Sequence, residues 1–333
     1  MSSGVVLETV SDKEAGTRLD RWIKRRVQIS QGQVEKLLRT GQVRVDGARA
    51  KSSTRLETGQ EVRLPPFSPE AYKGESARTA KSEGVSPRDA AFIRDLVIYQ
   101  DDDVIALNKP AGIAVQGGTK QGRHLDGMLG ALATDGERPK LVHRLDRDTS
   151  GVLVLARHPR AAAELGELFR SREMDKVYWA VTIGVPNPRA GQLRSWMVKG
   201  QGPGDMREIM VPGRQGQEGA RHAITDYATV STAGQKAAWV ACKPVTGRTH
   251  QIRFHLQELG TAILGDPKYK TEREVPGGVG QGLHLHARGI ILPRDTGRDV
   301  EITAPLPPHM AETFAALGFL EEEAGSDLME PFL

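Results

Sequence analysis

A polar segment near residue 70 divides the chain into two parts, each of which needs a core of its own. From Phe67 to Ala90 the sequence runs FSPEAYKGESARTAKSEGVSPRDA, which is rich in Ser, Gly, Pro and charge and has no sustained apolar period. Such a composition is typical of a linker. We therefore expect a domain over residues 1–65, a linker over 66–90, a second domain over 91–318 and an acidic tail over 319–333.

The overall composition is that of an ordinary globular protein, with 38% apolar and 26% charged residues. No basic segment followed by an apolar run opens the chain, and no apolar run approaches the roughly 18 residues of a membrane span. Cys242 is the only cysteine, which excludes an internal disulfide and a thiolate metal cluster. We expect a cytoplasmic protein with no membrane partner.

Positive charge is concentrated in the first part of the chain. Residues 17–64 hold twelve Lys and Arg against five Asp and Glu, a local net charge of +7. The whole chain carries +4, so the remainder carries −3. A concentration of this kind is expected for binding a polyanion such as RNA, although a solvated basic surface with no partner is the alternative.

The same part has the pattern helix, helix, hairpin. RLDRWIKRRV spaces apolar side chains as in a helix with a basic exposed face, and Ser30 with Gln33 forms a capping box for a second helix that Gly41 ends. Asp46-Gly47 between two alternating runs predicts a tight hairpin.

The strings TRLDRWI, VEKLLRTGQVRVDG and LETGQEVRLPP resemble the S-four RNA-binding domain, named for a ribosomal protein. The resemblance covers about the first 65 residues and implies an RNA-binding surface. Its candidate contact residues are Arg18, Arg21, Lys24, Arg25, Arg39 and Arg44.

After Asp95 the pattern changes to many short β-type runs with few helices. LVIYQ, DVIALNKP, VYWAVTIGV, DYATV and AWVACKPV predict strands, and HLDGMLGALA, RAAAELGELFRS and HQIRFHLQELG predict helices. No period of 20 to 50 residues repeats. The second domain is expected to be α+β, with helices packed on a largely antiparallel mixed sheet.

One polar stretch lies between two apolar runs, in LVHRLDRDTSGVLVLAR from Leu141 to Arg157. Such a stretch is often only a turn, closed by residues such as Thr149, Ser150 and Gly151. HRLDRDTSG, however, resembles the active-site motif of the RluA superfamily of pseudouridine synthases, in which the Asp of HRLD is the catalytic carboxylate. Asp146 occupies that position.

Further strings in the same order support the resemblance: NKPAGIAVQGG, KVYWAV, TGRTHQIRFHLQELG, ILGDPKY, LHLHA and APLPPHM. They run from Leu96 to about Met310. The sequences NKPAGIAVQGG and LVHRLDRDTSG are most similar to those of RluC-like members. Residues 195–221 match the family loosely, so no role is assigned to them. The resemblance implies a central catalytic cleft and conversion of uridine to pseudouridine in RNA.

The chemistry of that reaction needs a carboxylate and no redox group, metal or nucleotide. The C–N bond to uracil breaks, the base turns, and a C–C bond forms. A uracil anion spreads its charge over the ring and leaves with less help than a sugar, so one carboxylate suffices. Asp146 must be ionised either to attack the sugar or to remove a proton from it, and the sequence leaves both roles open.

The resemblance assigns three more residues. The Arg of HQIR, Arg253, is the cation that keeps the catalytic carboxylate ionised; otherwise it is a surface ion-pair residue. Arg144 takes the place of the flipped-out nucleotide. Tyr178 of KVY is implied to stack on the extruded base. Judged from the local pattern alone, it would instead be a core residue of a strand.

The histidines raise the alternative of a metal site. His284 and His286 would share one strand face, and His143, His250 and His255 lie in the motifs above. No HExxH, cysteine pair or GxxxxGK[ST] loop accompanies them, so neither a metal nor a nucleotide cofactor is expected.

The function predicted from sequence is therefore an RNA pseudouridine synthase acting as a monomer on large-subunit (23S) ribosomal RNA or a pre-ribosomal particle. Two alternatives stay open: a non-catalytic RNA-binding or ribosome-assembly factor, and a tRNA-directed synthase of the same family.

Overall fold

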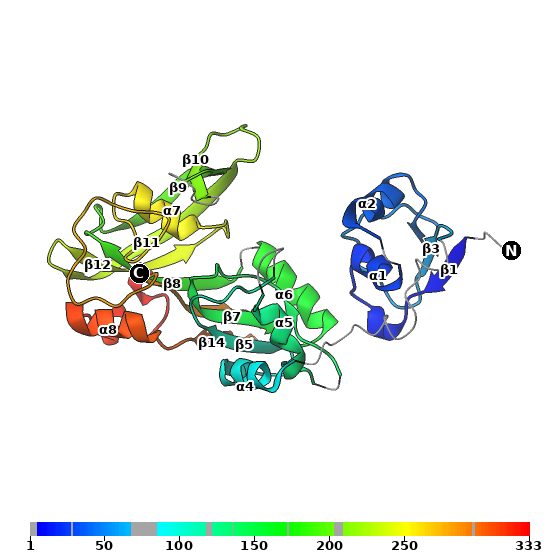
Figure 1. Cartoon of the computed structure of the whole chain (residues 1–333), viewed down its shortest axis with the longest axis horizontal. Helices are drawn as coiled ribbons and strands as arrows, with labels where there is room; N and C mark the ends of the chain where they lie inside the picture. The colour runs from blue at the N-terminus through cyan, green and yellow to red at the C-terminus, as the bar shows by residue number, and fades with distance from the viewer. Residues whose placement is uncertain are drawn as a thin grey trace. The chain divides into compact units, whose positions relative to one another are not determined.

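The computed structural model describes residues 5–27, 29–67, 85–117, 122–134, 136–171, 173–202, 209–294 and 297–333. The chain divides into two compact units with a boundary between Ser86 and Pro87 (Figure 1). Most of the expected linker, residues 68–84, lies outside the described residues. Helix α4, Pro87–Asp95, begins inside the range that sequence assigned to the linker, and proline suits the first turn of a helix.

The N-terminal unit packs two helices against a three-stranded sheet. Helices α1 and α2 span Leu19–Arg26 and Gln31–Arg39, after a short 3₁₀ turn at Asp12–Glu14. The sheet has the order β1–β3–β2, with strands Val6–Thr9, Glu61–Leu64 and Arg44–Val45. Both layers contribute to one apolar core, formed by Val10, Leu19, Trp22, Ile23, Val34, Leu38, Val43, Val45, Leu56, Val62 and Leu64.

The predicted capping box of α2 is present. The Ser30 hydroxyl accepts the N–H of Gln33 at 3.3 Å, and the Gln33 side chain accepts the N–H of Ser30 at 2.7 Å. The predicted turn is also present, since Asp46 and Gly47 have φ values of 48° and 76°. Val45 and Ala48 exchange both backbone hydrogen bonds across this turn, at 3.0 and 2.9 Å, but the run after it forms no strand, and β2 pairs with β3 instead. The polar run after the turn has few apolar side chains to bury.

The C-terminal unit is built on one 11-stranded sheet, which confirms the α+β prediction. Its order is β10–β9–β11–β12–β8–β13–β7–β5–β4, with β14 on β13 and β6 on β7. The first half of these strands along the chain is β4 Val97–Gln100, β5 Val104–Lys109, β6 Lys140–Leu141, β7 Ser150–Ala156, β8 Asp175–Ile183 and β9 Ala190–Gly200. The second half is β10 Ile209–Pro212, β11 Arg221–Ala233, β12 Ala237–Pro244, β13 Leu285–Leu292 and β14 Val300–Thr303.

Two helices cover opposite faces of the middle of this sheet. Alternate residues of β12 belong to different cores: Trp239 packs with α8 (Pro308–Leu317), whereas Val240 packs with α7 (Gln251–Glu258). Figure 1 shows α7 in yellow over β11 and β12. Tyr178 of β8 lies on the α7 side, opposite Cys242 of β12 in the antiparallel register. The other helices of this unit are α5 Leu125–Met128, continued by a 3₁₀ turn at Leu129–Leu132, and α6 Pro159–Ser171.

A single parallel pairing joins the two halves of the sheet. Among the described pairings, only β13 with β7 is parallel, through His286 to Ser150 and Ala287 to Gly151. The backbones approach closely here, because a Cβ on Gly151 would lie 2.2 Å from the carbonyl oxygen of Ala287. Gly151 also has a φ of 108°, which side chains rarely adopt. This seam positions the segment just before β7.

Residues 319–333, separated as an acidic tail by composition, pack on the C-terminal unit. Phe319, Ala324 and Leu328 are buried in the core that contains Trp239, and the segment forms short 3₁₀ turns at Glu321–Ala324 and Glu330–Phe332. The acidic side chain of Glu321 pairs with Arg288 at 3.1 Å. None of the described helices is long and apolar enough to cross a membrane.

Candidate active site

The HRLD segment forms a loop between β6 and β7, at the N-terminal end of β7. His143 fixes the first half of this loop, because its Nε2 accepts the N–H of Val154 at 2.8 Å and its ring stacks on Phe169 with centroids 4.3 Å apart. Burial, with a smaller effect of Lys176, lowers the pKa of His143 to about 3. The imidazole is therefore neutral at pH 7 and free to accept that hydrogen bond.

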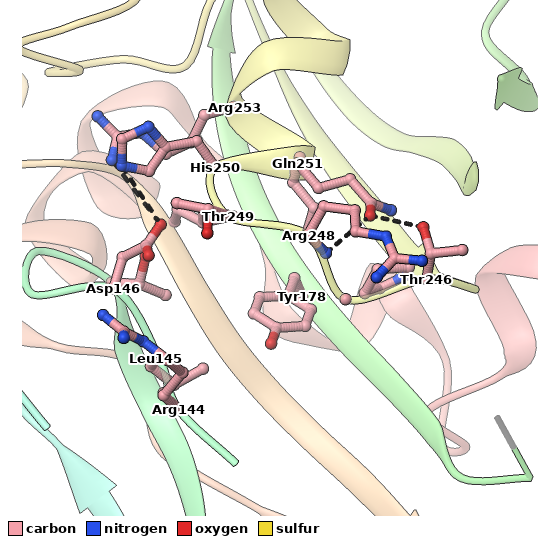
Figure 2. Close-up of a pocket in the computed structure, with 15 residues that line it drawn as sticks. Arg144, Leu145, Asp146, Tyr178, Thr246, Arg248, Thr249, His250, Gln251 and Arg253 are labelled. Carbon is pink, nitrogen blue, oxygen red and sulfur yellow. Dashed lines mark hydrogen bonds and ion pairs between the residues drawn. The ribbon is translucent and has the colours of Figure 1, made fainter. Parts of the chain in front are cut away.

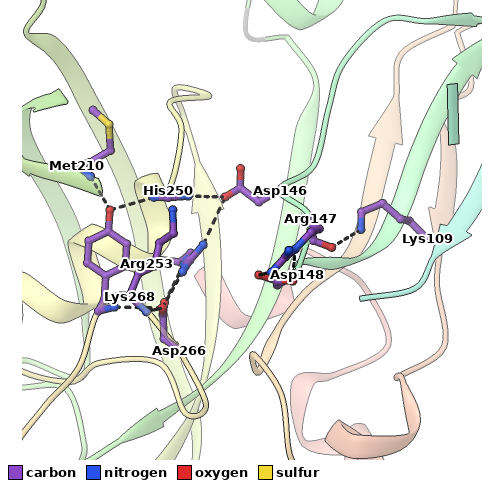
Figure 3. Close-up of polar contacts among 10 residues, drawn as sticks. Lys109, Asp146, Arg147, Asp148, Met210, His250, Arg253, Asp266 and Lys268 are labelled. Carbon is purple, nitrogen blue, oxygen red and sulfur yellow. Dashed lines mark hydrogen bonds and ion pairs between the residues drawn. The ribbon is translucent and has the colours of Figure 1, made fainter. Parts of the chain in front are cut away.

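Lys109, at the end of β5 in the NKP string, fixes the second half of the loop. Its ammonium is fully buried and donates to the carbonyls of Pro110, Ile113 and Arg147 at 2.9, 2.8 and 2.9 Å. Figure 3 shows the bond to Arg147. Burial lowers the pKa of Lys109 to about 8, and the nearby carboxylates of Asp148 and Asp146 oppose that effect. The sequence analysis missed this residue, although the string containing it was identified.

The loop presents Asp146 to a cavity of about 150 Å³ (Figure 2). The side chain of Asp146 is 24% exposed, so the carboxylate is reachable yet partly desolvated. The cavity brings together three of the predicted residues, Arg144, Tyr178 and Arg253, with Asp146. Its other described lining residues are Leu145, Thr149, Pro244, Thr246, Gly247, Arg248, Thr249, His250, Gln251, Ile252 and Leu285.

Arg253 is the buried cation nearest to Asp146 in the contacts described. Its Nη1 lies 3.9 Å from Asp146 Oδ2, while its Nε and Nη2 donate to the two oxygens of Asp266 at 2.7 and 2.6 Å. Figure 3 shows the guanidinium between the two carboxylates. The Asp266 carboxylate also accepts the N–H of Lys268 at 2.8 Å. Sequence reasoning expected Arg253 beside Asp146, where the structure has it, but missed Asp266, which lies in the string ILGDPKY and orients Arg253.

His250 is the second group close to the carboxylate. Its Nε2 lies 3.9 Å from Asp146 Oδ2, and burial lowers its pKa to about 4 against the opposing effect of Asp146. The Tyr269 oxygen accepts the N–H of Met210 at 2.8 Å and lies 3.1 Å from His250 Nδ1. The tyrosine hydroxyl can therefore donate to Nδ1, which leaves the imidazole proton on Nε2, facing Asp146. His250 has a φ of 54°, an uncommon backbone conformation for a residue with a side chain.

Tyr178 presents its ring to the same cavity from β8. Burial and the charge of Asp146 raise the pKa of its phenol, so it is neutral at pH 7. In the view of Figure 2 the ring lies between Asp146 and Thr246. A flat neutral ring on the wall of the cavity suits stacking against a planar base.

The segment before α7 is held by Gln251. Its amide nitrogen donates to the carbonyl of Ile224 at 2.8 Å, and its amide oxygen accepts from Thr246 Oγ1 at 2.6 Å and from Arg248 N–H at 3.1 Å. Because α7 carries Arg253 and is preceded by His250, the bond to Ile224 of β11 helps to fix both groups that face Asp146. Gln251 is a supporting residue that the string HQIR contained but the sequence analysis did not single out.

The remaining predicted histidines have structural partners. His284 Nε2 lies 2.7 Å from Thr313 Oγ1, His286 Nδ1 lies 2.9 Å from Ser150 Oγ, and His255 is between Ser195 and Thr225, 2.8 Å from each hydroxyl. In the part of the chain that the structure describes, no group of three or more His, Cys, Asp or Glu could hold a metal ion.

The predicted basic residues of the N-terminal unit differ in their surroundings. Arg21, Arg25 and Arg39 are exposed. Arg18 forms an ion pair with Asp20 at 2.7 Å. Arg44 donates to the carbonyls of Gly41 and Gly47 and so stabilises the local backbone. Lys24 is half-buried. Of the six predicted contact residues, Arg21, Arg25 and Arg39 are therefore the ones exposed to solvent.

Comparisons with known proteins agree with this geometry. The family model for RNA pseudouridylate synthase matches residues 103–258, which include the HRLD loop, Tyr178 and Arg253, and the S4 domain matches residues 17–62. A ribosomal large subunit pseudouridine synthase C from Rickettsia felis is 33% identical over 306 residues, covering 90% of this chain and 96% of that protein. The Escherichia coli protein of the same name is 34% identical and covers 91% and 93%.

Among solved structures, human RNA pseudouridylate synthase domain containing 4 is similar, with a TM-score of 0.59 and 30% identity over 69% of this chain and 97% of that one. The two sequence relatives extend over both units of the chain, and the matched model spans the loop that carries Asp146. The chain therefore belongs to the RNA pseudouridine synthase family of isomerases and carries an N-terminal S-four domain.

Proposed function

We propose that this protein converts specific uridines of large-subunit (23S) ribosomal RNA to pseudouridine. The observation that carries the proposal is the carboxylate of Asp146 at the cavity wall, 3.9 Å from a guanidinium that Asp266 holds in place. The choice of RNA is supported by the relatives whose names specify the ribosomal large subunit.

Asp146 is the proposed catalytic residue. Its ionised carboxylate either attacks the sugar carbon as the bond to uracil breaks or removes a proton from the sugar, and both steps use the charge that Arg253 stabilises. The uracil then turns and rejoins the sugar through carbon. Atoms balance within the nucleotide, so the proposed reaction uses no metal, redox cofactor or nucleotide cofactor.

Arg144 and Tyr178 are proposed to hold the extruded nucleotide. Arg144 is exposed beside the cavity, two residues before Asp146, where it would occupy the space that the flipped nucleotide leaves. Tyr178 would stack on the uracil. The cavity volume of about 150 Å³ suits one base and not a stacked pair.

The N-terminal unit is proposed to anchor RNA through phosphates. Arg21, Arg25 and Arg39 are exposed, and within the described residues their guanidinium groups form no hydrogen bond or ion pair. Arg18, Lys24 and Arg44 add positive charge to the same domain. The protein is proposed to act as a monomer, in the cytoplasm where ribosomes are assembled.

The test is to map pseudouridine in ribosomal and transfer RNA from cells with and without the gene. Loss of one or more sites in the large-subunit RNA is expected. Loss of transfer RNA sites alone would favour a tRNA-directed synthase. An unchanged map together with altered ribosome assembly would favour a non-catalytic assembly factor, and purified Asp146→Asn protein restoring assembly would support that reading.

A further inference from the structure

A second cavity adjoins the one that contains Asp146. It has a volume of about 400 Å³ and continues past Tyr178, whose ring belongs to both walls. The two cavities also share Arg144, Pro244, Thr246, Gly247 and Arg248. A nucleotide whose base occupies the first cavity can therefore reach the second with its backbone.

The second cavity is lined by cations from four separate segments. Arg144 comes from the HRLD loop, Arg170 from α6, Lys176 from β8 and Arg248 from the segment before α7. No Asp or Glu is among its described lining residues, which otherwise are His143, Phe169, Tyr178, Pro244, Val245, Thr246 and Gly247. Such a wall favours an anion.

Lys176 is the half-buried cation of this wall, whereas Arg144, Arg170 and Arg248 are exposed. Its ammonium forms no hydrogen bond within the described residues and lies 5.8 Å from the centroid of the Phe169 ring. Burial lowers the pKa of Lys176, and the charge of Asp175 opposes this only in part. Asp175 itself lies 3.7 Å from Lys243. Because this half-buried ammonium makes no hydrogen bond with the described residues, an anionic ligand in the cavity could pair with it directly.

The spacing of these groups fits an RNA backbone. Lys176 and Tyr178 are two residues apart on β8, so their side chains leave the same face of the strand. Tyr178 would contact the flipped base, and the neighbouring side chain would then meet the phosphate attached to that nucleotide or to the next one. Arg248 lies across the cavity, with its Nε donating to the carbonyl of His222 at 3.2 Å.

We propose that this second cavity binds one backbone phosphate of the RNA next to the target uridine, with Lys176 as its principal ligand. The inference rests on the proposed function, since it assumes that the base of the target enters the first cavity. Lys176 thereby becomes a positioning residue, which holds the backbone so that the sugar meets Asp146.

The test combines a protein change with a single change in the RNA. Full-length wild type and Lys176→Gln are compared on the shortest large-subunit RNA fragment that the protein binds, made with a neutral methylphosphonate at one linkage at a time on either side of each uridine. Lys236→Gln is the matched control, because Lys236 is exposed and outside the cavity. Dissociation constants and single-turnover rates are both measured.

At one linkage, 5′ or 3′ of the target, we expect the methylphosphonate to weaken binding to wild type by about tenfold, and to have no further effect on Lys176→Gln. The control should respond as wild type does. The position of that linkage distinguishes the two phosphates. Equal losses for wild type and Lys176→Gln at every linkage would overturn the proposal.

Thermal unfolding separates this role from a structural one. Because Gln removes an unpaired charge, Lys176→Gln should unfold at the same or a higher temperature than wild type, whereas a structural lysine would lower it. If wild type formed no pseudouridine in any RNA, the proposed function would fail, yet the dissociation constants would still decide whether a phosphate site exists.

Discussion

Asp266 binds Arg253 through both carboxylate oxygens, at 2.6 and 2.7 Å, and neither side chain is more than 2% exposed. The cation beside Asp146 is thus held by a different, fully buried carboxylate. Arg253 can remain in place whether or not Asp146 is engaged with substrate. The guanidinium of Arg253 therefore contacts two carboxylates, that of Asp146 in the cavity and that of Asp266 in the interior. Substitutions at Arg253 and Asp266 can separate its effect on activity from its effect on stability.

Replacing Arg253 by Leu should abolish activity and cost about 3 to 5 kcal/mol of unfolding free energy, because Asp266 is left buried and unpaired. The double variant Arg253→Leu with Asp266→Asn should regain much of the stability and remain inactive, since the amide can still accept the N–H of Lys268. Denaturant unfolding and single-turnover rates test both statements. An active double variant would show that Asp146 needs no cation from Arg253.

Asp146→Asn should remove turnover while leaving the dissociation constant for RNA nearly unchanged, because the amide keeps the size and polarity of the side chain but not its charge. Asp148→Asn is the matched control in the same loop. Asp148 pairs with its neighbour Arg147 at 2.9 Å, so this variant should keep most of its turnover. Pseudouridine formed in substantial amounts by Asp146→Asn would refute the catalytic assignment.

Lys109→Met should lower both the stability and the chemical rate. The methionine leaves the carbonyls of Pro110, Ile113 and Arg147 without their shared donor, and each buried unsatisfied group costs about 1 to 3 kcal/mol. The loss of order in the HRLD loop should appear as a slower single-turnover rate at saturating RNA. Lys236→Met, at an exposed site, is the control, and equal behaviour of the two variants would contradict this role of Lys109.

Acid should destabilise the fold through His143. Its pKa is about 3 in the folded protein and about 6.5 in an unfolded chain, so between these values the unfolded state binds one more proton. The contribution is complete above pH 6.5 and is lost as the pH falls toward 3, with a slope of about 1.4 kcal/mol per pH unit. In His143→Gln the slope of unfolding free energy between pH 5 and 6 should be smaller by that amount. An unchanged slope would mean that His143 is protonated in the native loop.

The salt dependence of RNA binding should report on the N-terminal unit. Changing Arg21, Arg25 and Arg39 together to Gln should weaken binding and reduce the slope of log K against log salt by about 2, at about 0.7 per phosphate contact with single-stranded RNA. The control is the exposed set Lys236, Arg273 and Arg298 of the other unit, changed in the same way. The chemical step at saturating RNA should be unaffected in both. A lost chemical step with an unchanged slope would place the three arginines in the active site.

Local signals predicted the elements that carry the site. The apolar spacing of Ile252 and Leu256 located α7, and short β-type runs located β8 and β12, because each of these features depends on neighbours within a few residues. The β9–β10 pair was not predicted, since it lies in the Gly-rich region 195–221 and is defined by pairing rather than by apolar pattern. Pairings of distant segments, such as β2 with β3, also escaped local reasoning.

The site was predicted to the extent that its residues lie in recognised strings. Asp146, Arg144, Tyr178 and Arg253 surround one cavity, as the resemblance implied. The sequence does not show the contacts through which three further residues act: Asp266, Lys109 and Tyr269. Asp266 binds Arg253, 13 residues before it, and Lys109 binds three carbonyls. Tyr269 contacts a histidine and a backbone amide.

The sole cysteine gives this enzyme a built-in probe of its own local opening. Cys242 is fully buried opposite Tyr178, and burial raises the pKa of its thiol. A thiol-alkylating reagent, which attacks the exposed thiolate, can reach this sulfur only when β12 opens. The labelling rate of the unmodified protein therefore measures how often β12, the strand paired with that of Tyr178, separates from its neighbours. A slower rate in the presence of RNA would measure how far RNA binding suppresses this opening.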